Sequence, residues 1–287
     1  MKFILKALFI TILCFSQAQA QKLENSLLWK ISGNDLEQSS YLYGTVHITC
    51  DASLSTKVLQ ALEETSQLVL ELDMDDPSLQ MDMMSDVMMK DGKTLKSMLT
   101  KEEYNMLNTF MTNEMGMPLE MFNSMKPFFI NAMFYPKMLD CPVESFEGEL
   151  MKVTKTQNEE ILGLETVKEQ LAVFDAIPYE DQLKDLLRSA KDNLEFDKKF
   201  FAEMLKAYNK EDLNKLMDIM EDENYLISSK HSDKLLEKRN KNWISKIESI
   251  AEETPTFFGV GAGHLGGENG VINLLRKQGY TVEAVLN

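Results

Sequence analysis

Strand-like and helical segments alternate near the start of this chain, and this order restricts the possible folds more than any other feature of the sequence. Residues 27–31 and 41–48 predict two strands joined by a turn, which together form a hairpin. Residues 55–65 have the apolar spacing of a helix, with Ser55 as the expected N-cap, and residues 68–74 predict a third strand. A strand, helix, strand order is typical of a parallel crossover unit.

The second half of the chain returns to the same alternation. Residues 161–165 predict a short strand, and long helical segments follow over residues 166–252. A strand over 256–260, a helix over 269–277 and a final strand from Tyr280 complete the pattern. We therefore predict an α/β fold in which helices flank a mixed central sheet.

Between these two parts, residues 76–140 differ in character. Fifteen of the 20 methionines fall between Met74 and Met138, and the helical signals are short and broken by glycine and proline. This composition predicts a Met-rich helical insertion into the sheet domain. The flexible methionines fill an irregular core in the simplest interpretation. A mobile apolar groove over a site and copper(I) binding by thioethers remain the alternatives.

The first 20 residues have the features of a cleavable signal peptide. Lys2 and Lys6 precede a short apolar run at 7–15, and Ala18-Gln19-Ala20 matches a signal peptidase site. The apolar run is too short to span a bilayer, which takes about 20 residues. We expect export to the periplasm or full secretion, no membrane span, and a single domain over 21–287.

The charge and the cysteines limit the choice of partners. The formal charge is −16, and it becomes −18 without the two lysines of the signal peptide, so the surface repels phosphate backbones and argues against nucleic acid. Cys50 and Cys141 either form a disulfide or remain free, because their spacing alone does not bring them together.

Two similar segments, Gly44-Thr45-Val46-His47 and Gly261-Ala262-Gly263-His264, each place a histidine at the exit of a predicted strand. Glu71 and Glu165 fall at the ends of two other strands. Open α/β folds bind ligands at the carboxyl edge of the sheet. These four side chains are therefore suited to a divalent metal or to general acid–base catalysis, whereas a single histidine at a strand end is more often structural. For the third histidine, His231, we expect a surface or capping role.

With these segments, the sequence resembles the TraB/GumN family. The resemblance rests on Tyr41-Leu42-Tyr43-Gly44-Thr45-Val46-His47 with Glu71-Leu72-Asp73, on Gly163-Leu164-Glu165-Thr166 with Gln170, on Arg239-Asn240 followed by Trp243, and on Val260-Gly261-Ala262-Gly263-His264-Leu265. It extends over almost the whole chain after the signal peptide. The family is similar in fold to Tiki ectodomains, erythromycin esterases and ChaN-like haem-associated proteins, and Tiki proteins are metal-dependent proteases.

The resemblance implies a hydrolase-like pocket with four principal residues, namely His47, Glu71, Arg239 and His264. Four further candidates are Glu144, Glu147, Glu165 and Asn240. A divalent metal (manganese, cobalt or zinc) would be held by His47, His264 and Glu71, and Arg239 would bind a substrate carboxylate or an oxyanion. Asn240 follows Arg239 on a helix and so points about 100° away, which separates the two side chains.

We therefore predict an exported metal-dependent hydrolase, most simply a peptidase, that acts on a peptide or another small molecule with water as nucleophile. The alternatives are a non-catalytic protein that binds a ligand, haem or a metal, and a metal-free esterase-like hydrolase. The oligomeric state is not indicated by the sequence.

Overall fold

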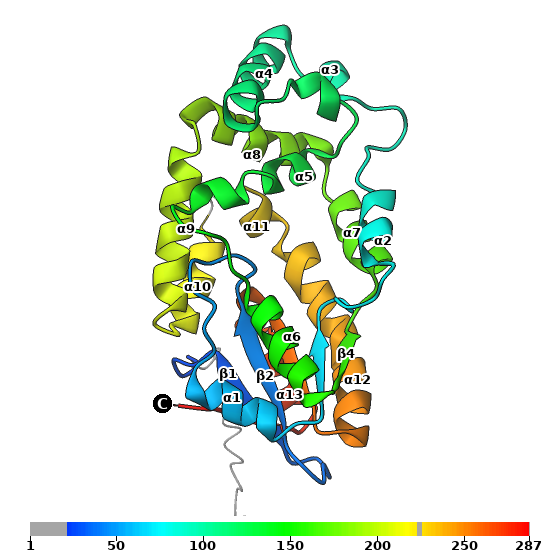
Figure 1. Cartoon of the computed structure of the whole chain (residues 1–287), viewed down its shortest axis with the longest axis vertical. Coiled ribbons are helices and arrows are strands. Elements are labelled where there is room, and N and C mark those ends of the chain that lie inside the picture. Colours follow the sequence, from blue (N-terminus) through cyan, green and yellow to red (C-terminus); the bar gives the residue numbers. More distant parts are fainter. Residues whose placement is uncertain (1–21, 223–225, 287) are drawn as a thin grey trace, which may run out of the picture.

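The computed structural model describes residues 22–222 and 226–286, so the predicted signal peptide lies outside the described residues. A six-stranded sheet occupies one end of the molecule (Figure 1), and its strands lie in the order β4-β3-β5-β2-β1-β6. The strand bounds are β1 Leu28–Ser32, β2 Ser40–Thr45, β3 Gln67–Leu70, β4 Glu160–Gly163, β5 Phe257–Gly261 and β6 Thr281–Ala284.

The sheet is mixed, as the sequence predicts. Strands β2, β5, β3 and β4 are parallel neighbours, whereas β1 runs antiparallel to both β2 and β6. The predicted β1–β2 hairpin is therefore confirmed. Three strands end earlier than predicted, namely β2 at Thr45, β3 at Leu70 and β4 at Gly163. The β2–β5 ladder stops at the pair Thr45 and Gly261, and the β3–β4 ladder stops at the pair Leu70 and Gly163.

Helices cover both faces of the sheet. On one face lie α1 (Thr56–Glu63) and α6 (Phe146–Gln157), and on the other lie α12 (Lys238–Glu253) and α13 (Val271–Lys277). Side chains of a strand alternate between the two cores: in β2, Tyr41 and Tyr43 join the first core and Leu42 joins the second. Ser55 is the N-cap residue of α1, although its side chain makes no capping hydrogen bond.

Most of the Met-rich segment forms a helical cap at the end of the molecule away from α1, whereas its first helix, α2, lies beside the helix of residues 167–175 (Figure 1). Its elements are α2 Leu79–Ser85, α3 Leu95–Met98, α4 Lys101–Met115, η1 Leu119–Phe122, α5 Pro127–Ala132 and η2 Tyr135–Met138. The cap has its own apolar core. That core also takes Leu183 and Leu186 from α8 (Tyr179–Asp192), so the cap extends beyond the predicted insertion.

Seven of the 15 methionines between Met74 and Met138 belong to this core or pack against it, as the simplest interpretation expects. Met89 and Met111 are buried in it, and five more pack against it, namely Met98, Met115, Met117, Met125 and Met133. Five others are exposed, namely Met74, Met81, Met84, Met88 and Met121. Flexible side chains suit this core because its short helices meet at irregular angles.

Several helices connect the cap with the sheet (Figure 1), and they divide the long helical region predicted over 166–252. Their bounds are α7 Val167–Asp175, α9 Glu195–Tyr208, α10 Leu213–Met220, α11 Leu226–Lys230 and the π-helical turn η3 Asp233–Glu237. In the described part of the chain, no helix combines the length and apolar character needed to cross a membrane.

Candidate functional site

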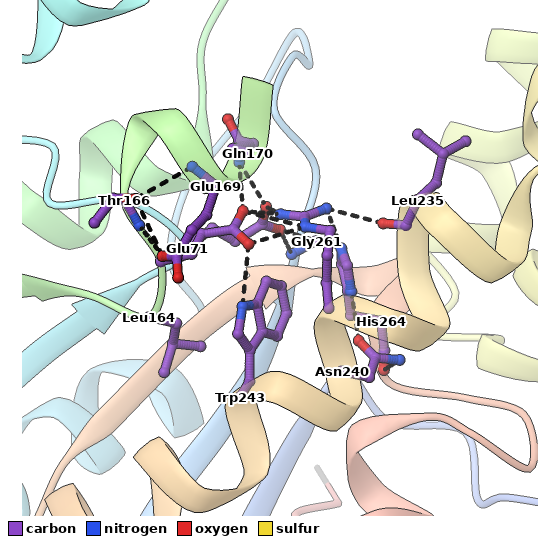
Figure 2. A network of polar contacts seen from close by, with 12 residues as sticks. Glu71, Leu164, Thr166, Glu169, Gln170, Leu235, Asn240, Trp243, Gly261 and His264 are labelled. Atoms are coloured by element: carbon purple, nitrogen blue, oxygen red, sulfur yellow. Dashed lines mark hydrogen bonds and ion pairs between the residues drawn. The ribbon is translucent and has the colours of Figure 1, made fainter. Parts of the chain in front are cut away.

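The parallel strands bring the predicted side chains to one edge of the sheet. Strands β2, β3, β4 and β5 all end at this edge, and the chain just beyond these ends carries His47, Glu71, Glu165 and His264. Figure 2 shows the polar network that results, with Trp243 reaching it from one side and Gln170 from the other. The structure thus places the four predicted strand-end residues close together.

Gly261 occupies the centre of this group. A methyl group on Gly261 would lie 3.2 Å from Glu71 Oε1, 3.6 Å from His264 Cδ2 and 4.0 Å from His47 Nε2. The three side chains therefore surround one point, which the absence of a side chain on Gly261 leaves open. Its backbone N–H also donates a hydrogen bond to Glu71 Oε1 at 2.8 Å.

The Arg239 guanidinium connects the carboxylates to one imidazole. Its Nε donates to Glu165, and Nη2 donates to Glu71 Oε2 at 2.5 Å and to Glu165 Oε1 at 2.6 Å. Its Nη1 contacts the Leu235 carbonyl and His264 Nε2, both at 3.0 Å. Arginine has five N–H donors, and each has an acceptor here. In this arrangement Arg239 positions its neighbours and has no donor left for a substrate oxyanion, which differs from its predicted role.

Glu71 is a buried carboxylate that remains ionised. Burial raises its pKa, but the imidazole of His264 and the guanidinium of Arg239 outweigh burial and hold the pKa at about 2. Gln170 Nε2 donates to Glu71 Oε2 at 3.3 Å and to Glu165 Oε1 at 3.1 Å. Trp243 Nε1 donates to Glu165 Oε2 at 3.3 Å. Both carboxylates are therefore held in fixed orientations by donors.

His264 is buried, and both of its ring nitrogens have a partner. Nδ1 lies 2.6 Å from Asn240 Oδ1, while Nε2 faces Arg239. The amide oxygen can only accept, so Nδ1 carries the proton and Nε2 has a free electron pair. Burial lowers the pKa of this imidazole to about 3, so it is neutral at physiological pH. The predicted separation of Arg239 and Asn240 is wrong, because the side chains reach the same ring from two sides.

His47 lies on the open side of the site, with 71% of its side-chain surface exposed. Its Nδ1 is 2.8 Å from Glu147 Oε1, which also accepts a hydrogen bond from Thr45 Oγ1 at 2.7 Å. The surrounding protein lowers the pKa of His47, but the hydrogen bond and charge of Glu147 raise it to about 9. Because the ring is open to water, this pair contributes little stability.

Glu144 lies outside the cluster of His47, Glu71 and His264. Its carboxylate accepts from the backbone N–H of Ala52, and its backbone pairs with Thr49. Nearby, Cys50 and Cys141 form a disulfide with Cα atoms 5.6 Å apart, which resolves the choice that the sequence leaves open. Glu144 therefore secures the segment that follows His47 and does not contact the reacting centre.

The third histidine does not have the expected surface position. His231 is buried, its Nε2 lies 3.0 Å from Asp181 Oδ2 in α8, and its Nδ1 lies 3.1 Å from Lys234 Nζ. Tertiary packing of α11 beneath the cap buries a residue that the local sequence pattern places at the surface.

The donor set at Gly261 is of the kind that binds zinc, manganese or cobalt. Both imidazoles place Nδ1 against a carboxylate or amide oxygen, as metal-ligating histidines usually do, so Nε2 is the atom of each that would bind a metal. His264 Nε2 and Glu71 Oε1 are 3.6 Å apart. Over residues 22–222 and 226–286, however, no three such side chains are close enough to form a complete metal site. Metal binding through His264 requires Arg239 Nη1 to give up its contact.

The sequence matches the TraB/PrgY/gumN family over residues 27–284, which is nearly the whole described chain. The chain belongs to this family. The matched region includes both Gly-x-x-His segments and Glu71.

Curated relatives of this TraB/PrgY/gumN protein are metalloproteases by name. The metalloprotease TIKI2 of Danio rerio is 23% identical over 320 residues, which cover 92% of this chain and 62% of that protein. The metalloproteases TIKI1 of Danio rerio and of Homo sapiens are each 23% identical and cover 90% of this chain, with 63% and 62% of their own lengths matched. This chain therefore spans a little less than two thirds of the length of these relatives.

Sequence reasoning gave no role to several residues that shape the site. Thr45 orients Glu147, and Gln170 and Trp243 hold the carboxylates. Gln170 and Trp243 carry part of the family resemblance, which is the signal by which they could have been found. Thr45 belongs to the Tyr41–His47 segment that also carries the resemblance, so the same signal applies to it.

Proposed function

We propose that this TraB/PrgY/gumN protein is an exported metal-dependent hydrolase that cleaves peptide bonds with water as nucleophile. The observation that carries the proposal is the arrangement of the two imidazoles around Gly261. Each has its Nδ1 held by an oxygen acceptor; His264 Nε2 lies 3.6 Å from Glu71 Oε1, and His47 Nε2 lies 4.0 Å from the position of a methyl group on Gly261. The distant similarity to metalloproteases supports peptide bonds as the substrate.

His47, Glu71 and His264 would hold the metal. When bound, a divalent metal polarises a carbonyl oxygen and lowers the pKa of a bound water. Glu147 and Asn240 accept from the Nδ1 atoms of the two histidines, so a metal would bind through the Nε2 atoms, and His47 would lose its Nε2 proton on binding it. His47 can exchange a proton with bulk water, because its ring lies on the exposed side of the site.

Arg239 and Glu165 have a supporting role in this proposal. Glu165 accepts three contacts from the guanidinium and so fixes the position of Arg239. Together with the imidazole of His264, Arg239 lowers the pKa of Glu71 and keeps it ionised, which a metal ligand must be. This ion pair network places a charged carboxylate where burial alone favours the neutral acid.

Export is part of the same proposal. The Cys50–Cys141 disulfide supports it, because disulfides form and persist in oxidising compartments such as the periplasm or the cell exterior. The signal-peptide pattern of the first 20 residues points in the same direction.

A metal-free hydrolase is a second candidate, and one specific contact favours it. Arg239 Nη1 lies 3.0 Å from His264 Nε2, the atom through which a metal would bind. Without metal, His47 is protonated at neutral pH and His264 is neutral, so the two imidazoles are an acid and a base. In this case His264 would act as base only after Arg239 moves.

The test is the metal content of the purified protein beside His47→Ala and His264→Ala, with melting followed under added manganese, cobalt and zinc. Under the proposal, wild type binds close to one equivalent and melts at a higher temperature with metal, and both variants lose this effect. His231→Gln is the matched control, because this histidine lies outside the site.

Each result has a clear meaning. Equal metal binding by wild type and both alanine variants contradicts the assigned ligands. No binding by folded wild type, together with peptide cleavage that His264→Ala abolishes, would establish the metal-free alternative. Metal binding without cleavage of any peptide in a broad library would refute the hydrolase and leave a metal-binding protein.

A further inference from the structure

Three phenylalanines pack together where the cap meets α7 (Figure 1), and we call them the phenylalanine cluster. The rings of Phe128 and Phe174 are stacked with their centroids 3.9 Å apart, and Phe129 packs edge-on against both at 5.5 and 5.6 Å. All three residues are only partly buried, and none belongs to the three apolar cores of the described chain or packs against them. The cluster is therefore an apolar surface separate from the cores that stabilise the fold.

Two buried polar groups fix the helices that carry these rings. Gln182 is 1% exposed, and its Oε1 accepts from the Phe128 backbone N–H at 3.1 Å while its Nε2 donates to the Phe174 carbonyl oxygen at 2.9 Å. Lys126, the N-cap of α5, is fully buried with its Nζ 2.6 Å from Asp175 Oδ1 at the end of α7. Such buried groups are costly unless they are paired, and here both pairings join α5 to α7. The rings are thus held in one arrangement before any ligand binds.

The phenylalanine cluster lies on the side of α7 that faces the candidate site. Gln170 and Phe174 are four residues apart on this helix, so their side chains project from the same face, about 6 Å apart along the helix axis. The amide of Gln170 contacts Glu71 and Glu165 in the site. One turn further along this face, toward the cap, lies Phe174, which stacks on Phe128. The cluster therefore continues the candidate site in the direction of the cap.

The position and chemistry of the cluster limit what it can bind. An extended peptide covers about 3.4 Å per residue, so a bond held at Gly261 places a side chain about two or three residues away next to the rings. Partly exposed aromatic rings bind other aromatic side chains by offset or edge-to-face contacts, which add to the burial of apolar area. A charged side chain would lose its water there without gaining a partner from the rings.

We propose that the phenylalanine cluster binds an aromatic side chain of the substrate peptide, about two or three residues from the bond that is cleaved. This proposal rests on the proposed function, because it takes the substrate to be a peptide. Phe128 and Phe174 contact the substrate ring, and Gln182 positions both of them. The expected specificity is cleavage of peptides with phenylalanine at that position in preference to alanine or glutamate.

The experiment compares cleavage of peptides with blocked ends that are built from alanine, glycine and serine. One position at a time carries phenylalanine, and the matched peptide carries alanine there. We expect phenylalanine about two or three residues from the cleaved bond to raise kcat/KM about tenfold over alanine in the wild type. Phe174→Leu should reduce this preference to about threefold and leave kcat/KM of the alanine peptide unchanged.

Val173→Ala is the matched control. Val173 precedes Phe174 on α7 and is also partly buried, but its side chain points about 100° away. Equal kcat/KM for the phenylalanine and alanine peptides in the wild type overturns the proposal, as does an equal loss of preference in Val173→Ala. A lower melting temperature of Phe174→Leu with an unchanged preference shows that the rings only join the cap to α7, which also overturns it.

A binding measurement separates the outcome for the cluster from that for the hydrolase. The probe is a blocked glycine–serine pentapeptide with 4-fluorophenylalanine at its centre, observed by fluorine NMR with the full chain. The rings should shift the fluorine signal in the wild type, and Phe174→Leu should weaken binding about threefold. This result without cleavage of any peptide contradicts the proposed function and leaves the aromatic site standing. Cleavage without a preference for phenylalanine, and without a shifted signal, contradicts the aromatic site and leaves the hydrolase standing.

Discussion

Replacing Arg239 tests whether its guanidinium stabilises the buried carboxylates of Glu71 and Glu165. Replacing it with methionine keeps much of the side-chain volume and removes all five donors. Glu71 and Glu165 then lose their cation, and their side chains are only 11% and 5% exposed. Breaking a buried ion pair by removing one partner costs about 3 to 5 kcal/mol, because the remaining charge has no compensation. We expect a loss of this size in the free energy of unfolding at pH 8.

The loss should depend on pH with a definite sign. In the wild type, the pKa of Glu71 falls from 4.5 to about 2, so this group contributes stability above pH 4.5 that is lost as the pH falls toward 2. Without Arg239, burial raises the pKa of Glu71, and the carboxylate destabilises the fold as the pH rises through that raised value. The difference between wild type and Arg239→Met should therefore shrink between pH 8 and pH 4.

Urea unfolding followed by circular dichroism at the two pH values measures both quantities. Adding Glu165→Gln to Arg239→Met should restore about 1 kcal/mol or more, because one buried charge is removed with its partner. Lys241→Met, a surface change on the same helix, should stay within about 0.5 kcal/mol of wild type. A loss below about 1 kcal/mol, or a loss that is the same at both pH values, refutes the description of this network.

Three further predictions address other parts of the molecule. Cys50→Ser should lower the free energy of unfolding by about 2 to 4 kcal/mol in thermal or urea unfolding, since the disulfide joins residues 91 apart in sequence; an unchanged midpoint contradicts this. Gly261→Ala should abolish metal binding in calorimetry while the fold persists, because a methyl group there lies 3.2 Å from Glu71 Oε1. Metal binding equal to that of wild type would contradict the assignment of the metal site to the space at Gly261. Lys126→Ala should destabilise the protein by about 3 to 5 kcal/mol, because Lys126 is fully buried and its Nζ lies 2.6 Å from Asp175 Oδ1. Amide hydrogen exchange in the cap should then become faster, and unchanged exchange rates would contradict this prediction.

The alternation of strands and helices could be predicted from the sequence, because it depends on local periodicity and turn residues. The hairpin of β1 and β2, the parallel strands around it and the Met-rich helical cap all follow from such patterns. The position of His47 and His264 at strand exits followed for the same reason. Strand ends were less certain, because each end depends on where the neighbouring strand stops.

Other features depend on residues that are distant in sequence. Glu71 and Arg239 are 168 positions apart, and they meet because α12 packs on the sheet face to which β3 and β5 contribute. The joining of α8 to the cap and the burial of His231 beneath it likewise depend on how helices pack. No periodicity encodes these distances.

The sequence by itself thus determined which side chains reach the carboxyl edge of the sheet, because glycine turns and strand ends are local properties of the chain. Only the tertiary structure decided what these side chains do to one another. The network around Arg239 holds Glu71 ionised, and Arg239 and Asn240 occupy both ring nitrogens of His264. These protonation states and hydrogen bonds depend on distances of a few ångström between separate elements.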